Sequence, residues 1–363
     1  MLIQALPQRQ VIESVSVRLT TADDMDYPAY DNTRLQAVNT CPTWGQLRYG
    51  MHKSMSHGGR AMPLEMGSAA HEVFAAVRLW QLRHYQQHVA LSDFHGPRLF
   101  GITRYQAMLT AVDPREDDRS QSLGFCLSAL ETSGFYDDPS DRRRTYTNLE
   151  EACIAYIDRW DWNRMPVWIR DEDDPQSDVG IELPFDITLS FVLKDGNTIH
   201  YRFIGKADGL HTKGGDIVLH ENKTASRLDE AWRQSFHLNS QPTGYMLALG
   251  VWAQQAITKG EIYGLCVPLP KNYDFGGIVR EPITREVHHF ERWFDWFLHT
   301  ASLDQQYKDN PYGAPRYTHS CNRYFRPCSF IPFCDASDED QRQIVTEMAV
   351  DEWSPLHLVE GGD

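Results

Sequence analysis

Apolar residues recur along the chain with two different periods, and these predict where helices and strands form. A period of three to four residues predicts a long helix from about Leu64 to Val89, with Ala69, Val73 and Val77 on one face. Similar spacing predicts further helices at Thr33–His52 (interrupted by Cys41-Pro42), Gln121–Thr132, Leu149–Trp162, Leu228–Gln255 and Glu286–Tyr307. Alternating apolar and polar residues predict strands at Glu182–Leu193, Thr198–Ala207, Ile217–Lys223 and Glu261–Pro268.

Turn sequences and changes in composition divide the chain further. Asp195-Gly196 and Lys213–Asp216 predict tight turns that join three of the strands into a β-meander. The charged stretches Asp137–Arg144 and Asp171–Asp178 predict solvated loops. We therefore predict a mixed α/β protein with four parts: an N-terminal segment (1–91), a helical insertion (92–178), a core that holds the strands (179–310) and a cysteine-bearing segment with an acidic tail (311–363).

Composition narrows the class of protein. The 363 residues include 41% hydrophobic side chains, which argues against a disordered chain. The N-terminal sequence lacks a signal-peptide pattern and the apolar runs are too short to span a bilayer, so we expect a cytoplasmic protein without a membrane partner. The net charge of −15 argues against binding nucleic acid through the global field, but it leaves room for a local basic groove.

Two acidic residues and a lysine stand at the ends of neighbouring predicted strands. Asp208 ends the second meander strand, and Glu221 and Lys223 end the third. Residues two apart on a strand share a face, so Glu221 and Lys223 project together, and the hairpin brings Asp208 beside Glu221. Two carboxylates with the Asn222 carbonyl suit Mg²⁺ or Mn²⁺, and the ammonium can stabilise charge on a phosphorus-centred transition state. A surface salt bridge between Glu221 and Lys223 is the alternative interpretation.

Two helical pairs fit the same chemistry. Gly67 and His71 are four residues apart, so they share a helix face; the glycine would allow close approach to the sheet, and the imidazole can bind a metal. Gln241 and Tyr245 have the same spacing on the helix after the third strand, where they would hold DNA or Lys223. Taken alone, a histidine such as His71 is more often a core residue than a ligand, and the second pair is an ordinary polar helix face.

Four motifs follow one another in a fixed order: GSAAH (67–71), GKADGL (205–210), HENKT (220–224) and QPTGY (241–245). In this order they resemble the PD-(D/E)XK nuclease superfamily, specifically its RecB-type branch. The resemblance covers about Thr33–Lys53, Glu65–Trp80 and Glu182–Cys334. It implies a restriction-endonuclease-like core, in which helices flank a mixed central sheet, and the activity of a phosphodiester hydrolase on DNA.

The resemblance also implies a role for each matching position. His71, Asp208 and Glu221 would bind the metal together with the Asn222 backbone carbonyl, and Lys223 would be the catalytic lysine. Gln241 and Tyr245 match the Q-x-x-x-Y helix of this branch, and Glu182 matches a frequent upstream acidic position. Asn222 departs from the pattern, since many relatives carry an aromatic residue, Leu or Val there; its side chain should face away from the metal.

The seven cysteines are unevenly spaced, and three of them lie within fourteen residues. Cys41, Cys321, Cys328 and Cys334 resemble the one-plus-three arrangement that clamps a four-iron (4Fe-4S) cluster in AddB-type nucleases and in the nuclease of CRISPR adaptation. Thiolates bind iron–sulfur clusters or zinc, so zinc on the same four residues is the alternative. We expect Cys126, Cys153 and Cys266 to be ordinary buried cysteines.

Arginines near the motifs are candidates for contacts to DNA phosphates. Arg227 and Arg233 follow the third strand, and Arg323 and Arg326 flank an aromatic pair in the cysteine segment. Arginines beside aromatic residues suit binding of single-stranded DNA, although they would equally neutralise an acidic protein surface. We expect an exonuclease that acts on DNA ends or single strands in recombination, repair or phage DNA processing. The alternative is a non-catalytic DNA-binding or assembly subunit; without a G-x-x-x-x-G-K-[ST] loop, a helicase or annealing protein would be a separate partner.

Overall fold

The computed structural model describes residues 12–55, 62–88, 119–139, 141–160, 166–169, 178–269, 277–323 and 326–351. The predicted acidic loop at 171–177, the first part of the predicted insertion and the tail beyond 351 lie outside these residues. The chain divides into two compact units, Met1–Gly59 with Phe185–Gly205 and Val287–Leu358, and Arg60–Pro184 with Lys206–Glu286 and Val359–Asp363.

One mixed sheet carries the main strands. These are β1 (Ile12–Leu19), β2 (Ala29–Tyr30), β6 (Ile181–Leu193), β7 (Thr198–Lys213), β8 (Asp216–Ala225), β9 (Lys259–Cys266) and β10 (Ile278–Thr284). The order is β1-β6-β7-β8-β9-β10, with β2 paired to β7, and β6 and β7 have residues in both units. Strand β8 runs antiparallel to β7 and parallel to β9, which confirms a mixed sheet.

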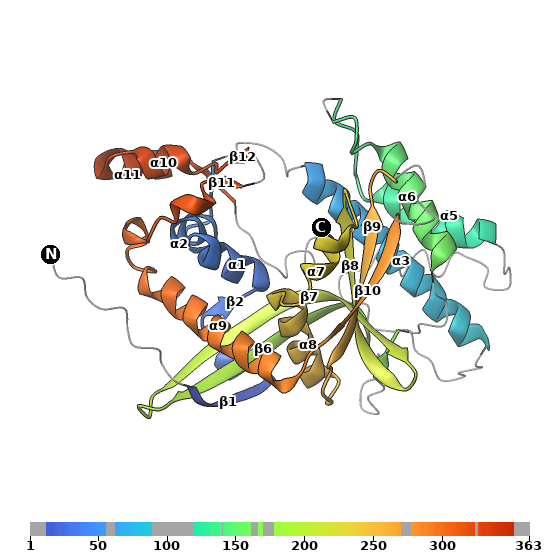
Figure 1. Cartoon of the computed structure of the whole chain (residues 1–363), viewed down its shortest axis with the longest axis horizontal. Coiled ribbons are helices and arrows are strands. Elements are labelled where there is room, and N and C mark those ends of the chain that lie inside the picture. Colours follow the sequence, from blue (N-terminus) through green and yellow to red (C-terminus); the bar gives the residue numbers. More distant parts are fainter. Residues whose placement is uncertain are drawn as a thin grey trace. The chain divides into compact units, whose positions relative to one another are not determined.

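The first unit contains helices, short helical turns and two pairs of short strands. Its helices are α1 (Asn32–Thr40), α2 (Pro42–Gly45), α9 (Val287–Gln306), α10 (Ile331–Asp335) and α11 (Asp338–Glu347), with shorter helical turns at Ala22–Asp24, Gln46–Gly50, Pro311–Gly313 and Thr318–Ser320. Figure 1 shows α1 and α2 beside α9. The paired short strands are β3 (Lys53–Ser54) with β13 (Ala349–Val350) and β11 (Asn322–Arg323) with β12 (Arg326–Pro327).

A buried carboxylate connects α9 to the N-terminal helices of this unit. Asp304 is 1% exposed and accepts hydrogen bonds from Tyr30, Arg34 and Gln46. A buried charge is tolerated where it is paired and fully hydrogen-bonded, so this hub explains why an aspartate lies on the buried face of α9.

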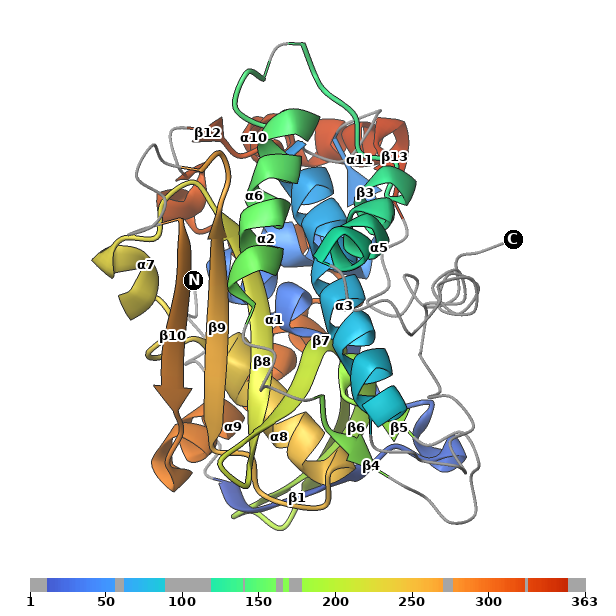
Figure 2. The same ribbon diagram turned by 90° about the vertical axis from the view of Figure 1, so that its right-hand side faces the viewer.

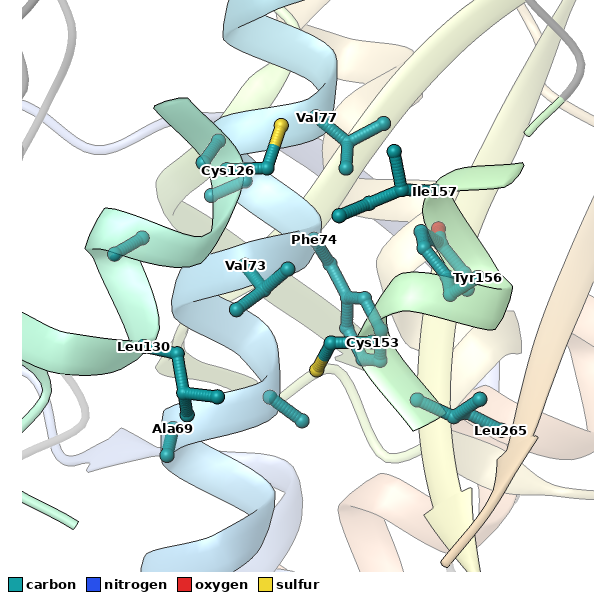
Figure 3. Close-up of a cluster of buried hydrophobic side chains, with 14 of the residues drawn as sticks. Ala69, Val73, Phe74, Val77, Cys126, Leu130, Cys153, Tyr156, Ile157 and Leu265 are labelled. Carbon is teal, nitrogen blue, oxygen red and sulfur yellow. The ribbon is translucent and has the colours of Figure 1, made fainter. Parts of the chain in front are cut away.

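In the second unit, three helices pack around one core. Helices α3 (Met62–His88), α5 (Arg119–Thr132) and α6 (Tyr146–Arg159) lie next to one another (Figure 2). Their apolar faces form a buried cluster with β9, and Phe74 of α3 reaches Cys153 and Tyr156 of α6 (Figure 3). Cys126 and Cys153 are completely buried there, as predicted. A short pair of strands, β4 (Trp168–Ile169) and β5 (Asp178–Val179), completes this part.

The β7–β8 hairpin has the turn that its sequence predicts. Gly214 and Gly215 have φ angles of 57° and 88°, and both central positions of a type I′ turn require such positive values. The prediction that β7 ends near Ala207 is wrong, because the strand continues through Asp208 to Lys213. The register places Gly209 opposite His220, and Asp208 therefore lies opposite Glu221.

The predicted single helix Leu228–Gln255 is wrong, because the structure has two helices there. Helix α7 (Glu230–Gln234) is capped by Asp229, and α8 (Ser240–Trp252) begins after a new cap at Asn239. Pro242 lacks the N–H that the middle of a helix requires but is accepted in a first turn, so it favours a start at this point. Strand β10, which sequence patterning did not predict, pairs with β9 at the end of the strand order. None of the helices in the described ranges combines the length and apolarity that a membrane crossing needs.

Candidate active site

Two carboxylates face each other across the β7–β8 hairpin in the second unit. Asp208 is 8% exposed and Glu221 is 2% exposed, so both are buried near the same point of the sheet. The Asp208 carboxylate accepts the backbone N–H of Asn222 at 2.5 Å. This hydrogen bond takes the place of a ladder bond and fixes the carboxylate between the two strands.

His71 and Glu182 join Asp208 in a three-residue cluster. One ligand atom from each of the three side chains lies within 4.8 Å of the others, and His71 Nδ1 is 3.1 Å from Asp208 Oδ1. Glu182 also pairs with Lys206 at 2.6 Å. Its backbone is left-handed, with a φ of 50°, a conformation that costs about 1–3 kcal/mol in a non-glycine residue. Such strain at a cluster of charged groups is typical of functional sites.

Lys223, whose side chain is 27% exposed, pairs with the buried carboxylate of Glu221, which argues against a pair that lies wholly on the surface. Lys223 Nζ is 2.6 Å from Glu221 Oε1, and the carboxylate side of the pair is 3% exposed. The other oxygen, Oε2, is buried and has no hydrogen-bond partner among the described residues. An unpaired buried carboxylate oxygen is costly, so this atom is a strong candidate for a metal ligand.

The charges of the cluster shift one another's protonation. Burial raises the pKa of Glu221 to about 7, although Lys223 opposes the shift. Burial would also raise the pKa of Asp208, but His71, Lys223 and the Asn222 amide together hold it well below its usual range. Burial opposes protonation of His71, yet the adjacent Asp208 carboxylate raises its pKa. Burial opposes the charge of Lys223 too, but the nearby carboxylates of Glu221 and Asp208 outweigh it and raise the pKa of Lys223.

These donors suit a divalent cation. Carboxylate oxygens are ligands for Mg²⁺ and Mn²⁺, and an imidazole adds to the Mn²⁺ set. The amide and carbonyl of one strand residue point to the same side, so the Asn222 carbonyl is directed toward the side on which its N–H meets Asp208. The site can therefore combine a cation held by oxygen donors with a neighbouring ammonium.

Gly67 lies near β8 but leaves room for a side chain. A Cβ at this position would meet Thr224 Oγ1 at 3.6 Å, which is an ordinary van der Waals contact. Helix α3 therefore approaches the sheet here as predicted, but the approach does not depend on the glycine, because an alanine would also fit.

Gln241 and Tyr245 contact each other on the first turns of α8. Gln241 Nε2 donates to the Tyr245 hydroxyl at 3.0 Å, and Tyr245 is 8% exposed. The buried Arg285 donates to Thr243 Oγ1 in α8 and to the Phe236 carbonyl in the segment before it. These hydrogen bonds connect the start of α8, which carries Gln241, to the preceding segment.

Most of the cations that the sequence places near Asp208 are paired with carboxylates. Lys206 pairs with Glu182, Lys213 with Glu261 at 2.7 Å and Arg233 with Glu281 at 3.4 Å. Arg227 is exposed in the segment after β8. The backbones of Arg323 and Arg326 pair across β11 and β12, while their side chains lie outside the described part of the structure.

The first unit brings Cys41, Cys321, Cys328 and Cys334 together. Cys41 separates α1 from α2, Cys334 lies on α10, and the backbone N–H of Cys328 donates to the Cys321 carbonyl at 2.7 Å. Burial raises the pKa of Cys334 to about 11; Arg316 opposes the shift, and the three other thiols add to it. The four thiols are therefore close enough to influence one another's charge.

Sequence reasoning missed Arg78, which holds the backbone beside Asp208. This guanidinium is 1% exposed and donates to the carbonyls of Asp208 at 2.7 Å and Leu210 at 2.5 Å. Between these carbonyls, Gly209 has a φ of 141°. The available signal was an arginine on the apolar face of α3, seven residues after His71 and so on the same face.

Comparison with known proteins agrees with this geometry. The family model described as the PD-(D/E)XK nuclease superfamily matches residues 32–335, which include the site residues and all four clustered cysteines. No curated protein matches the chain.

Proposed function

The chain belongs to the PD-(D/E)XK nuclease superfamily, and we propose that it is a metal-dependent DNA nuclease with His71, Asp208, Glu221 and Lys223 at its active site. One observation carries the proposal: Asp208 and Glu221 face each other beside Lys223, and Glu221 Oε2 is buried without a partner. A buried carboxylate oxygen without a partner is costly in a purely structural salt bridge, whereas a bound cation would satisfy it.

Each side chain has a defined task. His71 and Asp208 would hold Mg²⁺ or Mn²⁺ with the Asn222 carbonyl, and Glu182 forms a cluster with these two side chains. Glu221 lies outside that three-residue cluster and would contribute its buried Oε2. The cation would supply Lewis-acid activation of water and of the phosphodiester. Lys223 orients the attacking water and stabilises the charge that develops on the phosphate oxygens. Gln241 and Tyr245 act as a pair that positions the strand or Lys223.

We further propose the RecB-type branch and an exonuclease that acts on DNA ends or single strands. The order of the four motifs and the Gln241–Tyr245 pair support this branch. Recombination, repair or phage DNA processing is the proposed setting, with a helicase or annealing protein as a partner. A comparison of linear, circular and single-stranded labelled DNA separates end-dependent from internal cleavage.

The same proposal includes an iron–sulfur cluster on Cys41, Cys321, Cys328 and Cys334. The four thiols influence one another's charge, which supports a shared metal site. Thiolates bind iron–sulfur clusters and zinc alike, so the metal content of the purified protein decides between them.

The nuclease proposal is tested with purified protein and end-labelled DNA. We expect cleavage with Mg²⁺ or Mn²⁺, none with EDTA, and a loss of roughly 10²- to 10³-fold for Lys223→Ala, the usual effect of removing one charge-stabilising group. Circular dichroism controls for folding. If the wild type leaves all DNA substrates intact and Lys223→Ala behaves identically, the nuclease proposal is wrong.

A further inference from the structure

A buried tyrosine–asparagine pair lies directly behind the catalytic strand. The Tyr156 hydroxyl, from helix α6, donates to Asn222 Oδ1 on β8 at 2.9 Å. Tyr156 is 2% exposed and Asn222 is 1% exposed. A hydrogen bond in such a dry setting is costly to break, because the remaining polar atom has no water to replace its partner.

Asn222 occupies a central position in the site. It lies between Glu221 and Lys223, and its backbone N–H holds the Asp208 carboxylate. Its carbonyl points to the same side as that N–H. A small rotation of β8 at Asn222 would therefore displace Glu221, Lys223 and the Asp208 carboxylate together. A hydrogen bond to the Asn222 side chain opposes such a rotation.

Tyr156 is packed between two other aromatic rings. Its ring centroid is 4.5 Å from that of Phe74 on α3 and 5.6 Å from that of Trp160, the residue after α6. Figure 3 shows Phe74 and Tyr156 facing each other within the core between α3 and α6. A tyrosine hydroxyl carries one O–H, and the Asn222 side-chain oxygen accepts it.

We propose that Tyr156 is a positioning residue: by its hydrogen bond to the Asn222 side chain, it aligns the Asn222 backbone and the neighbouring carboxylates for metal binding. The inference rests on the proposed function, since it concerns the same metal site. It also assigns a role to α6, which sequence patterning treats as part of an insertion: this helix supports the catalytic strand from behind.

Removing the single hydroxyl tests this role. For Tyr156→Phe, we expect Mn²⁺ affinity, measured by isothermal titration calorimetry without DNA, to fall about 10- to 100-fold, as is usual when a group that orients a metal ligand is lost. A purely structural role would lower the unfolding midpoint and leave the Mn²⁺ affinity of the folded protein unchanged. That result would overturn the inference.

Two further variants complete the test. Gln81→Met removes the acceptor of the buried Trp160 Nε1 hydrogen bond (3.1 Å), which joins α3 to the residue after α6. It leaves the Tyr156–Asn222 hydrogen bond in place, so its Mn²⁺ affinity should equal that of the wild type. Asn222→Leu removes the acceptor, and adding Tyr156→Phe to it should cause no further loss if the two residues act as one unit. Additive losses would contradict the inference even if Tyr156→Phe alone folds poorly.

The outcome separates this inference from the proposed function. A wild type without measurable Mn²⁺ binding overturns the metal site and the positioning role together. If the wild type binds Mn²⁺, Asp208→Asn does not, and Tyr156→Phe binds as tightly as the wild type, the metal site stands and the role of Tyr156 is wrong.

Discussion

Gly209, the residue after Asp208, is a position where adding a single methyl group should strongly lower the free energy of unfolding. Its φ of 141° lies in a region that costs other residues about 1–3 kcal/mol. A Cβ would also lie 2.0 Å from the Gly180 carbonyl oxygen and 2.4 Å from Arg78 Nη1. Neither neighbour can retreat freely, because the Gly180 carbonyl accepts the N–H of Leu210 and Arg78 donates to Asp208 and Leu210.

The expected cost of Gly209→Ala follows from these contacts. Loss of one buried hydrogen bond from a charged group costs about 1.5–3 kcal/mol. Together with the backbone term, the free energy of unfolding should fall by roughly 3–6 kcal/mol, a large part of the 5–15 kcal/mol typical of a folded protein. Gly215→Ala is the matched control in the same hairpin: its φ is 88° but a Cβ there meets nothing within 4 Å, so we expect about 1–2 kcal/mol.

Urea unfolding followed by tryptophan fluorescence measures both variants. We expect the midpoint of Gly209→Ala to lie well below that of Gly215→Ala, with similar slopes. Equal midpoints for the two variants would refute the argument that Arg78 and Gly180 close the space around Gly209, and with it the view that Arg78 fixes the backbone of Asp208.

Three other predictions concern different parts of the chain. Burial raises the pKa of Asp31, the N-cap of α1, to about 6. The free energy of unfolding should therefore fall by up to about 3 kcal/mol as pH rises from about 4 to 6. Asp31→Asn keeps the cap and should flatten this pH dependence in urea titrations, whereas an unchanged pH dependence in the variant would contradict the prediction. Arg227→Ala should lower the slope of log affinity against log salt concentration for DNA binding, measured by fluorescence anisotropy, by about one unit. Arg233 already pairs with Glu281, so Arg233→Ala should change this slope less. Equal effects of the two variants would be evidence against a role of Arg227. Cys41→Ser should remove the brown colour and bound iron of anaerobically purified protein, while Cys126→Ser should keep both; a colourless wild type with stoichiometric zinc would exclude the iron–sulfur cluster.

Much of the β7–β8 hairpin could be predicted because its determinants are local in sequence. The Gly214-Gly215 turn sets the register of β7 and β8, and that register places Asp208 opposite Glu221. The period of two then places Lys223 beside Glu221, as the 2.6 Å contact shows.

The rest depends on contacts that sequence spacing does not encode. Arg78 reaches the Asp208 carbonyl from 130 residues away, and Tyr156 reaches Asn222 from 66 residues away. Glu182 joins the cluster from a left-handed backbone, a conformation that no local signal announces for a glutamate. Likewise, sequence spacing does not show that Arg233 pairs with Glu281, 48 residues away.

The rate of DNA cleavage by Asp208→Asn under single-turnover conditions tests the central claim most directly. The substitution keeps the size of the side chain and an oxygen acceptor for the Asn222 amide, but removes the negative charge that would hold the cation. We predict a folded protein in which Mn²⁺-dependent cleavage of end-labelled DNA is at least about 10³-fold slower than in the wild type. Cleavage by Asp208→Asn at the wild-type rate would contradict the assignment of this site as the nuclease centre.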